Sequence, residues 1–249
     1  MRILLISDLH YCLPQFDWVV SAAPRVELVV VAGDSLNIAS PVPLEAQSIV
    51  VLRYLSLLDE VTTVVVSSGN HDLTGPDADG EQSALWLAGA RRAGITTDGG
   101  SIMIGDTLIT VCPFWDGPVG RQAVMAQLSD EATRRPARWA WVYHWPPLGS
   151  PTCWTGHLSY GDTELGGWID HFGPDYVLAG HVHEAPFNAD GSWVDRVNST
   201  WVFNAGHQIG KAPAHIELDL DAGTAQWFSI MGEEEFDLTS DRVPARTVF

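Results

Sequence analysis

Five short apolar runs, each ending at an Asp, Asn or His, constrain the fold of this chain more than any other feature of its sequence. They are rich in β-branched residues and occupy residues 2–7, 26–33, 62–69, 139–143 and 175–180. Continuous apolar runs of this length are typical of strands buried on both faces, in a sheet that helices cover. The polar residues that follow the runs are Asp8, Asp34, Asn70 with His71, His144 and His181.

Three helical patterns lie in two of the intervals between these runs, at residues 43–59, 81–93 and 119–135. Pro43 stands near the start of the first one, where proline suits the first turn of a helix. The alternation of strand and helix predicts parallel strands joined by crossovers. Residues 95–114 and 214–230 instead each predict a strand, a turn and a second strand. We therefore expect an α/β fold in which two mixed β-sheets pack as a sandwich flanked by α-helices.

No linker, repeat or change of composition divides the chain, so a single domain over residues 1–249 is expected. Its motifs lie within residues 8–183, and residues 190–249 supply C-terminal strands and a tail. From Gly232 the tail is predicted to be solvated, with some strand-like pieces.

The charge of the chain limits its partners. With 13 basic and 31 acidic residues the formal net charge is −18. Such a surface repels phosphate backbones and anionic membranes, so neither nucleic acid nor a membrane is an expected partner, and the oligomeric state is left open. No segment approaches the roughly 20 apolar residues of a membrane span, and no signal peptide is recognisable. The three cysteines form no CxxC pair, which favours a reducing cytoplasm.

The polar residues after the runs belong to short motifs that suggest a metal site. In open α/β sheets, ligands bind beyond the carboxyl ends of strands, where these residues are expected to meet. Taken singly, Asp8 with His10, or Asp34 after Gly33, also fits an ordinary turn or helix cap. The motifs, in chain order, are SDLH, GDSLN, GNHD, HWPP and GHVH.

Taken together, the five motifs resemble the calcineurin-like metallophosphoesterase superfamily, whose blocks run DxH, GD, GNHD/E, H and GHxH. All five are present in that order across residues 8–183, and residues 202–207 also resemble the closing segment of that superfamily. The resemblance implies a four-layer αββα fold and a centre of two divalent metal ions. It implies that one ion is held by Asp8, His10, Asp34 and His183, and the other by Asp34, Asn70, His144 and His181.

These residue types suit the implied chemistry. Mixed imidazole and carboxylate ligands favour manganese, our first choice, or iron, zinc, cobalt or nickel over magnesium and calcium. Two ions about 3.5–4 Å apart can share a hydroxide and clamp a phosphoryl group. The resemblance places His71 beside the metals, where it would contact a phosphate oxygen or protonate the departing alkoxide, with Asp72 as its orienting partner.

Aromatic and histidine residues further along the chain are candidates for contacts with a substrate. Residues 145–162 form a long loop rich in Gly and Pro, and its aromatic side chains would stack on a base or cover an apolar group. Packing at the rim is the alternative for these loop residues, and for His207, which could lie near the metals, the alternative is an ordinary surface histidine. Cys12 is expected to be a packing residue rather than a metal ligand. The candidates are Trp115, Trp145, His157, Tyr160 and His207.

The function expected on these grounds is metal-dependent hydrolysis of small phosphomonoesters or phosphodiesters, nucleotides among them, by a metal-bridging hydroxide. A nuclease of the same superfamily is one alternative, which the acidic charge opposes. A non-catalytic metal-binding scaffold for protein partners is the other, and such a scaffold should have lost ligands or the GNHD histidine. This chain retains both.

Overall fold

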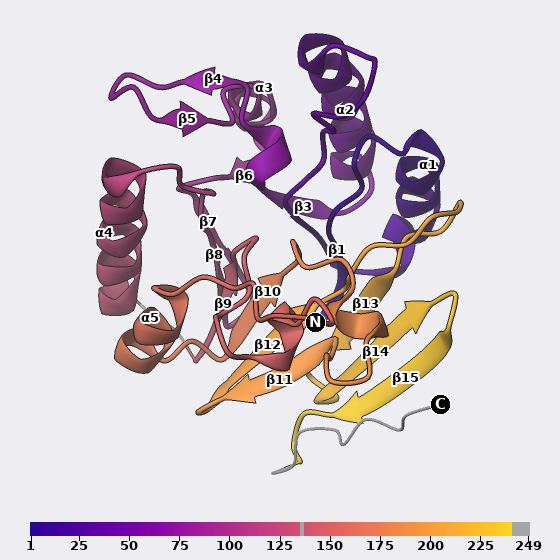
Figure 1. Cartoon of the computed structure of the whole chain (residues 1–249), viewed down its shortest axis with the longest axis vertical. Coiled ribbons are helices and arrows are strands. Elements are labelled where there is room, and N and C mark those ends of the chain that lie inside the picture. The colour runs from indigo at the N-terminus through magenta and orange to yellow at the C-terminus, as the bar shows by residue number, and fades with distance from the viewer. Residues whose placement is uncertain (135–136, 241–249) are drawn as a thin grey trace.

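The computed structural model describes residues 1–134 and 137–240, which form two mixed β-sheets packed face to face (Figure 1). In the first sheet, β1, β2, β3 and β6 are parallel, β13 pairs antiparallel with β1, and β14 and β15 each pair antiparallel with the strand before them. Its order is β15 (Gly232–Asp237), β14 (Thr224–Ser229), β13 (His215–Asp219), β1 (Arg2–Ile6), β2 (Leu28–Ala32), β3 (Thr63–Ser67) and β6 (Thr96–Thr97).

The second sheet has a parallel centre with an antiparallel strand at each edge. Strands β8, β9, β10 and β12 are parallel, whereas β7 and β11 run antiparallel to their neighbours. Its order is β11 (Val194–Val197), β12 (Thr200–Asn204), β10 (Tyr176–Ala179), β9 (Arg138–Val142), β8 (Thr107–Val111) and β7 (Ser101–Ile104).

The central strands are buried on both faces, as their continuous apolar sequence predicts. In β1, Ile3 and Leu5 join the core between the two sheets, whereas Leu4 and Ile6 pack with the helices on the outer face. In β9, Ala140 and Val142 face the core between the sheets, and the alternate residues pack outward. Helices therefore cover both outer faces, which confirms the predicted fold class. The helices are α1 (Leu13–Ala22), α2 (Leu44–Asp59) and α3 (Leu87–Arg92) on the first sheet, and α4 (Pro118–Arg134) and α5 (Leu165–Phe172) on the second.

Two of the three predicted helices agree closely with the structure. Helix α2 begins at Leu44, so Pro43 precedes the first helical residue, and α4 ends at Arg134, the last described residue before the gap. The third prediction, a helix over residues 81–93, is wrong in its first half. Residues 82–83 form β5 (Gln82–Ser83), which pairs with β4 (Gly75–Pro76).

Tertiary contacts explain that hairpin. The Glu81 carboxylate accepts hydrogen bonds from the backbone N–H groups of Val119 and Gly120 at 2.8 and 2.7 Å, in the first turn of α4. The Trp86 indole N–H donates to the Asp72 carbonyl at 3.1 Å. These contacts fix the segment in an extended form although its local sequence favours a helix.

Helices α1 and α5 were not predicted, although the sequence carries a signal for each. Pro14 lies in the first turn of α1, and Gly173 adopts the left-handed conformation directly after α5, with a φ of 56°. Both helices are short and their apolar periodicity covers few turns.

The C-terminal part follows the predicted hairpin. Strands β13 and β14 are antiparallel, and β15 continues the sheet with mostly exposed residues, so the tail begins with a full strand rather than isolated pieces. Residues 241–249 lie outside the described part, and the single domain stays a prediction. Within the described residues, no helix has both the length and the apolar character that a membrane crossing requires.

Candidate metal centre

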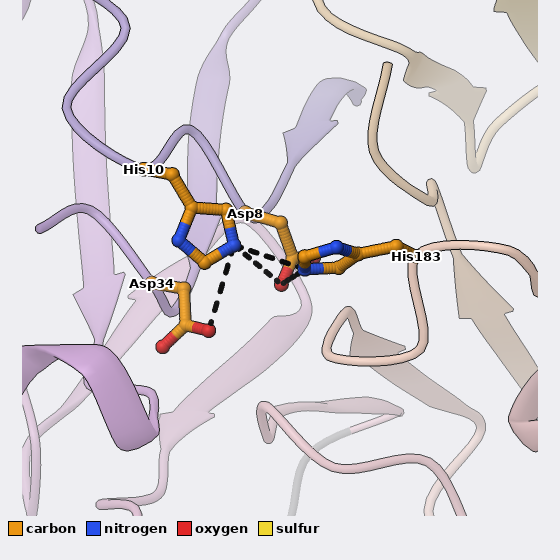
Figure 2. Close-up of side chains that lie close together, drawn as sticks. All are labelled: Asp8, His10, Asp34 and His183. Atoms are coloured by element: carbon orange, nitrogen blue, oxygen red, sulfur yellow. Dashed lines mark hydrogen bonds and ion pairs between the residues drawn. The ribbon is translucent and has the colours of Figure 1, made fainter. Parts of the chain in front are cut away.

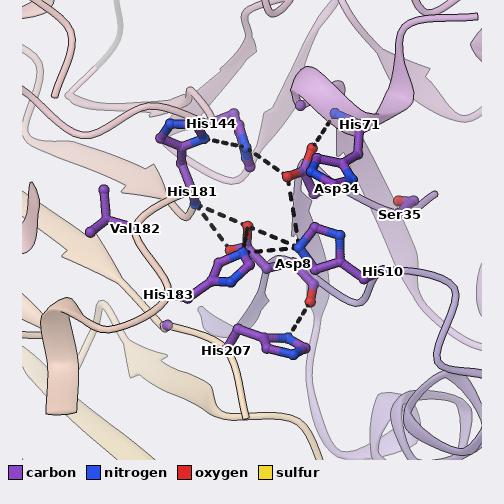
Figure 3. Close-up of polar contacts among 12 residues, drawn as sticks. Asp8, His10, Asp34, Ser35, His71, His144, His181, Val182, His183 and His207 are labelled. Atoms are coloured by element: carbon purple, nitrogen blue, oxygen red, sulfur yellow. Dashed lines mark hydrogen bonds and ion pairs between the residues drawn. The ribbon is translucent and has the colours of Figure 1, made fainter. Parts of the chain in front are cut away.

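The polar residues that follow the apolar runs meet where the carboxyl ends of strands from both sheets converge (Figure 3). Asp8 follows β1, Asp34 follows β2, and Asn70 and His71 follow β3 in the first sheet. His144 follows β9 and His181 follows β10 in the second. Because each of these residues lies only a few positions beyond its strand, the two sheets place their polar side chains on opposite sides of the same site.

A first cluster contains Asp8, His10, Asp34 and His183, whose ligand atoms all lie within 4.8 Å of one another (Figure 2). The Nε2 atoms of His10 and His183 are 2.9 Å apart, and His183 Nε2 is 3.3 Å from Asp8 Oδ1. Asp34 Oδ2 completes the group, 3.8 Å from His10 Nε2. This is the set that the resemblance to the superfamily implies for one metal ion.

A second cluster contains Asp34, His144 and His181, within the same 4.8 Å limit. His144 Nε2 lies 3.4 Å from Asp34 Oδ2 and 3.2 Å from His181 Nδ1. Asp34 thus belongs to both clusters, as the predicted bridging role requires. Asn70, the fourth expected ligand, has a buried Oδ1 atom with no hydrogen-bond partner among the described residues.

The nitrogen and oxygen atoms of the two clusters are better arranged to bind divalent cations than to form hydrogen bonds with one another. The His144 Nδ1–H donates to the Ala32 carbonyl at 2.7 Å, so in the neutral ring the Nε2 atom presents a lone pair to the cluster. His10 and His183 direct nitrogen atoms at each other, and the oxygen of Asn70 has no partner among the described residues. A buried set of imidazole, carboxylate and amide donors suits borderline first-row ions. The clusters therefore support divalent metal binding.

Unusual backbone conformations are concentrated here. Among the described residues, the non-glycine residues with positive φ include Asp8 at 55°, His10 at 45°, Asp34 at 53° and His181 at 70°. Left-handed backbone is costly for residues with a Cβ and persists where the surroundings impose it. Two backbone hydrogen bonds impose this conformation in the loop after β1. Asp8 N–H donates to the Gly33 carbonyl at 3.1 Å, and His10 N–H donates to the Asp34 carbonyl at 2.9 Å.

Burial and neighbouring charges set the protonation of the cluster. Burial lowers the pKa of His10 to about 4 and that of His181 to about 3, which keeps both imidazoles neutral. Burial also lowers the pKa of His144, but the Asp34 carboxylate raises it to about 9. For Asp8, burial raises the pKa, but the His183 hydrogen bond and nearby imidazoles bring it well below its usual range.

The predicted partnership of His71 and Asp72 is wrong in its geometry. The Asp72 carboxylate is buried and accepts hydrogen bonds from the backbone N–H groups of Leu36 and Gly69, both at 2.9 Å, and of Ser35 at 3.3 Å. His71 Nδ1 has no partner among the described residues. Asp72 therefore holds the loop after β2 against the loop after β3, and it does not orient His71.

His71 itself lies beside the first cluster, as expected. Its ring meets the ring of His10 edge to face, with centroids 4.5 Å apart. Its backbone N–H donates to Asp34 Oδ1 at 2.8 Å. The shared carboxylate thus has one oxygen held by the backbone and the other directed at the clusters.

The structure separates the five predicted substrate residues. Tyr160 and Trp145 pack against the His181 ring, with centroid distances of 5.2 and 4.9 Å. Trp115 instead donates its indole N–H to the Tyr143 hydroxyl at 2.7 Å and packs with the outer core near α4 and α5. His157 is exposed, and the described contacts do not connect it with the clusters.

His207 does reach the first cluster. Its Nδ1–H donates to the Asp8 carbonyl at 2.7 Å, and its ring lies 4.9 Å from that of His183. It therefore supports the strained backbone that presents Asp8. Cys12 lies outside both clusters, with its Sγ 3.9 Å from the Gly210 carbonyl, in agreement with the predicted packing role.

Two further residues near the clusters are not among the five predicted substrate residues. Phe114 packs against Trp145 and His144, with centroid distances of 5.4 and 6.1 Å, in the place expected for Trp115. Asn204 is fully buried and donates to the carbonyls of Thr152 and Val182, both at 2.9 Å. For Asn204, the signal in the sequence was the closing segment of the superfamily, residues 202–207, which contains it.

Known proteins resemble this chain in sequence family and in fold. The sequence model of the family described as calcineurin-like phosphoesterase matches residues 1–185. No curated protein sequence matches the chain. The crystal structure of TT1561 of Thermus thermophilus is similar with a TM-score of 0.61 and 14% identity, over 95% of this chain and 98% of that one. Yfce, a phosphoesterase from E. coli, has a TM-score of 0.47 and 14% identity, over 96% of this chain and 100% of that one.

Proposed function

Because the chain belongs to the calcineurin-like phosphoesterase family, we propose that it hydrolyses small phosphomonoesters or phosphodiesters at a centre of two divalent metal ions. The observation that carries the proposal is that the two ligand clusters share Asp34. One carboxylate that serves two adjacent ligand sets is the arrangement that a dinuclear centre needs. Manganese is the first candidate, with iron, zinc, cobalt and nickel as alternatives.

The residues of the first cluster and those of the second would each hold one ion. Asp8, His10, Asp34 and His183 supply the first set, and Asp34, Asn70, His144 and His181 supply the second. When bound, such ions polarise a phosphoryl oxygen and lower the pKa of a water toward neutrality. They also supply the positive charge that attracts an anionic substrate to a chain with a net charge of −18.

The protein positions these groups through its backbone. The Asp8 carboxylate accepts the His181 backbone N–H at 3.0 Å, which ties the loop after β1 to the loop after β10 across the two sheets. The His71 backbone N–H fixes Asp34 Oδ1, and the Ala32 carbonyl fixes the tautomer of His144. The ligands are therefore oriented before any ion arrives, which reduces the reorganisation that binding requires.

His71 is the residue that we assign to the leaving group. Its ring stands against His10 at the edge of the first cluster, and its Nδ1 atom has no partner among the described residues. A proton held on this imidazole would be transferred to the departing alkoxide oxygen as the ester bond breaks. Asp72 contributes by fixing the two loops that carry Asp34 and His71.

The test is turnover of matched monoester and diester substrates after removal of metal and reconstitution with each candidate ion. We expect activity to require the ion, and Asp34→Asn to reduce kcat/KM by more than about 100-fold, since loss of even an outer partner of a metal ligand costs 10- to 100-fold. Asp130→Asn is the charge-matched control, because Asp130 is exposed on α4 and forms an ion pair there with Arg134. Full activity of Asp34→Asn would contradict the shared site.

A further inference from the structure

Three aromatic side chains, Phe114, Trp145 and Tyr160, form a continuous wall beside the second cluster. Phe114 packs on Trp145 with ring centroids 5.4 Å apart, and Trp145 meets Tyr160 at 5.7 Å. The Tyr160 ring stacks on the imidazole of His181, with centroids 5.2 Å apart and planes inclined by 30°. The wall therefore begins directly at a metal-ligating side chain.

The outer end of the wall is open to an incoming molecule. Tyr160 is 50% exposed although one face of its ring covers His181, so the rest of the ring is available for contact. Trp145 is partly buried and packs against the outer core of the second sheet, which fixes the inner side of the wall. An exposed aromatic ring held on a partly buried one offers a flat, apolar surface beside the reacting centre.

The loop that carries Tyr160 is held in place by its backbone. Tyr160 N–H donates to the Cys153 carbonyl at 2.8 Å, and Asp162 N–H donates to the Pro146 carbonyl at 2.8 Å. Leu148 N–H donates in turn to the Asp162 carbonyl at 2.9 Å. Both ends of the loop are thus joined to each other, and Tyr160 is positioned before a substrate binds, which reduces the ordering cost of stacking.

Cationic side chains do not compete with the wall for this role. Among residues 1–134 and 137–240, the ion pairs and hydrogen bonds of the two clusters involve no arginine or lysine. The part of a substrate that extends beyond its phosphate on this side therefore meets aromatic carbon rather than charge. A flat π-system gains from such a surface, whereas a sugar or glycerol group alone gains little.

We infer that the substrate carries a flat aromatic group, such as a nucleobase, which stacks on Tyr160 beside the second cluster. This inference rests on the proposed phosphoester hydrolysis and specifies its substrate class. Stacking of one base on an aromatic side chain corresponds to roughly a 5- to 150-fold contribution to binding.

The experiment compares substrate pairs that differ only in the base. Adenosine 5′-monophosphate and ribose 5-phosphate both depart through a primary 5-alkoxide, and their methyl phosphodiesters form the corresponding diester pair. The measured quantity is the ratio of kcat/KM for the base-bearing and base-free members, in the metal-reconstituted protein. We expect this ratio to be at least about 5 in the wild-type chain for the class of ester that is cleaved.

Substitutions at position 160 then test the assignment. Tyr160→Ala should lower the ratio by about 5- to 150-fold, mainly through KM, and Tyr160→Phe should retain it because the ring is kept. Leu158→Ala is the control, since it removes an exposed apolar side chain of the same loop (54% exposed) that has no aromatic ring. We expect Leu158→Ala to keep the wild-type ratio.

The outcomes separate the two proposals. Turnover of base-free and base-bearing substrates at equal kcat/KM, or an unchanged ratio in Tyr160→Ala, would overturn the stacking inference and leave the phosphoesterase intact. A preference for a long-chain alkyl phosphate over adenosine 5′-monophosphate would also overturn it, because the wall would then bind aliphatic groups. Absence of turnover for every pair with every ion would instead refute the proposed function.

Discussion

Gly33→Ala should displace the proposed metal ligand His144, although the substitution replaces none of the proposed ligands. Gly33 has a φ of +86°, and a Cβ atom built on it would lie 2.2 Å from Nδ1 and 2.6 Å from Cγ of His144. The imidazole has little room to move, since His144 is 1% exposed and its Nδ1–H is bonded to the Ala32 carbonyl at 2.7 Å. The ring must therefore shift by about 1 Å or break this hydrogen bond.

Three contributions set the size of the effect. Left-handed backbone costs a residue with a Cβ about 1–2 kcal/mol. Overpacking in a filled core costs about 1–3 kcal/mol, and an unsatisfied buried hydrogen-bonding group about 1–3 kcal/mol. Together they predict a loss of about 3–8 kcal/mol in the free energy of unfolding. Gly80→Ala is the matched control, because Gly80 has the same φ of +86° with nothing within 4 Å of its Cβ position, and only the backbone cost applies.

The assay is chemical denaturation of the metal-free variants, together with the metal content of each after reconstitution. We expect Gly33→Ala to lose about 2–6 kcal/mol more than Gly80→Ala and to retain one ion rather than two. In a His144→Ala background the two closest contacts are gone and only Gly69 Cα remains near, 3.0 Å from the added Cβ, so the cost of Gly33→Ala should fall most of the way to that of Gly80→Ala. Equal losses for the two glycines in the wild-type background, or an undiminished cost of Gly33→Ala in the His144→Ala background, would refute the reasoning.

Three further predictions follow from other parts of the structure. His71→Ala should reduce the turnover of alkyl phosphoesters by about 10²- to 10⁴-fold and that of nitrophenyl esters much less, since a good leaving group needs no proton; equal losses in steady-state assays would replace the acid role by charge stabilisation. Burial raises the pKa of Asp98 to about 6 from an ordinary 3.8, despite its hydrogen bond from the Ser68 backbone N–H. The contribution of Asp98 to the free energy of unfolding should therefore fall by up to about 3 kcal/mol between pH 4 and pH 7. Asp98→Asn should remove that part of the pH dependence in urea titrations. Divalent ion at 100 times its dissociation constant should raise the free energy of unfolding by about 2.7 kcal/mol per site, an increase that a chelator reverses and Asp34→Asn lacks in thermal denaturation.

The site could be predicted from the sequence because its ligands are encoded locally. Each ligand follows a strand whose buried, β-branched run is visible in the sequence, and parallel strands bring their carboxyl ends to one edge. Asp8, His10, Asp34, His144, His181 and His183 accordingly all lie in the two clusters. The assignment of two ion sites came from the resemblance of the motifs to a known superfamily, and the shared position of Asp34 agrees with it.

The directions of neighbouring side chains were not encoded in the same way. Phe114 and Trp115 are adjacent aromatic residues, and only the packing of Trp115 on Tyr143 decides that Phe114 faces the cluster. Asp72 follows His71 directly, yet the amides of Leu36 and Gly69 draw its carboxylate away from the imidazole. Glu81 likewise belongs to a helical pattern, but it caps the start of α4 and leaves its own segment extended.

One physical reason explains why the ligands could be predicted from the sequence and the directions of their neighbours could not. Hydrophobic periodicity and strand ends depend on residues close in sequence, so the sequence by itself determined the α/β class, the central strands and the residues that can ligate metal. The partner of a carboxylate, the side of an aromatic ring and the strain at Asp8 and Asp34 depend on groups brought from distant segments. Only the tertiary structure supplied those groups, through neighbouring loops of the first sheet as well as through the packing of the two sheets.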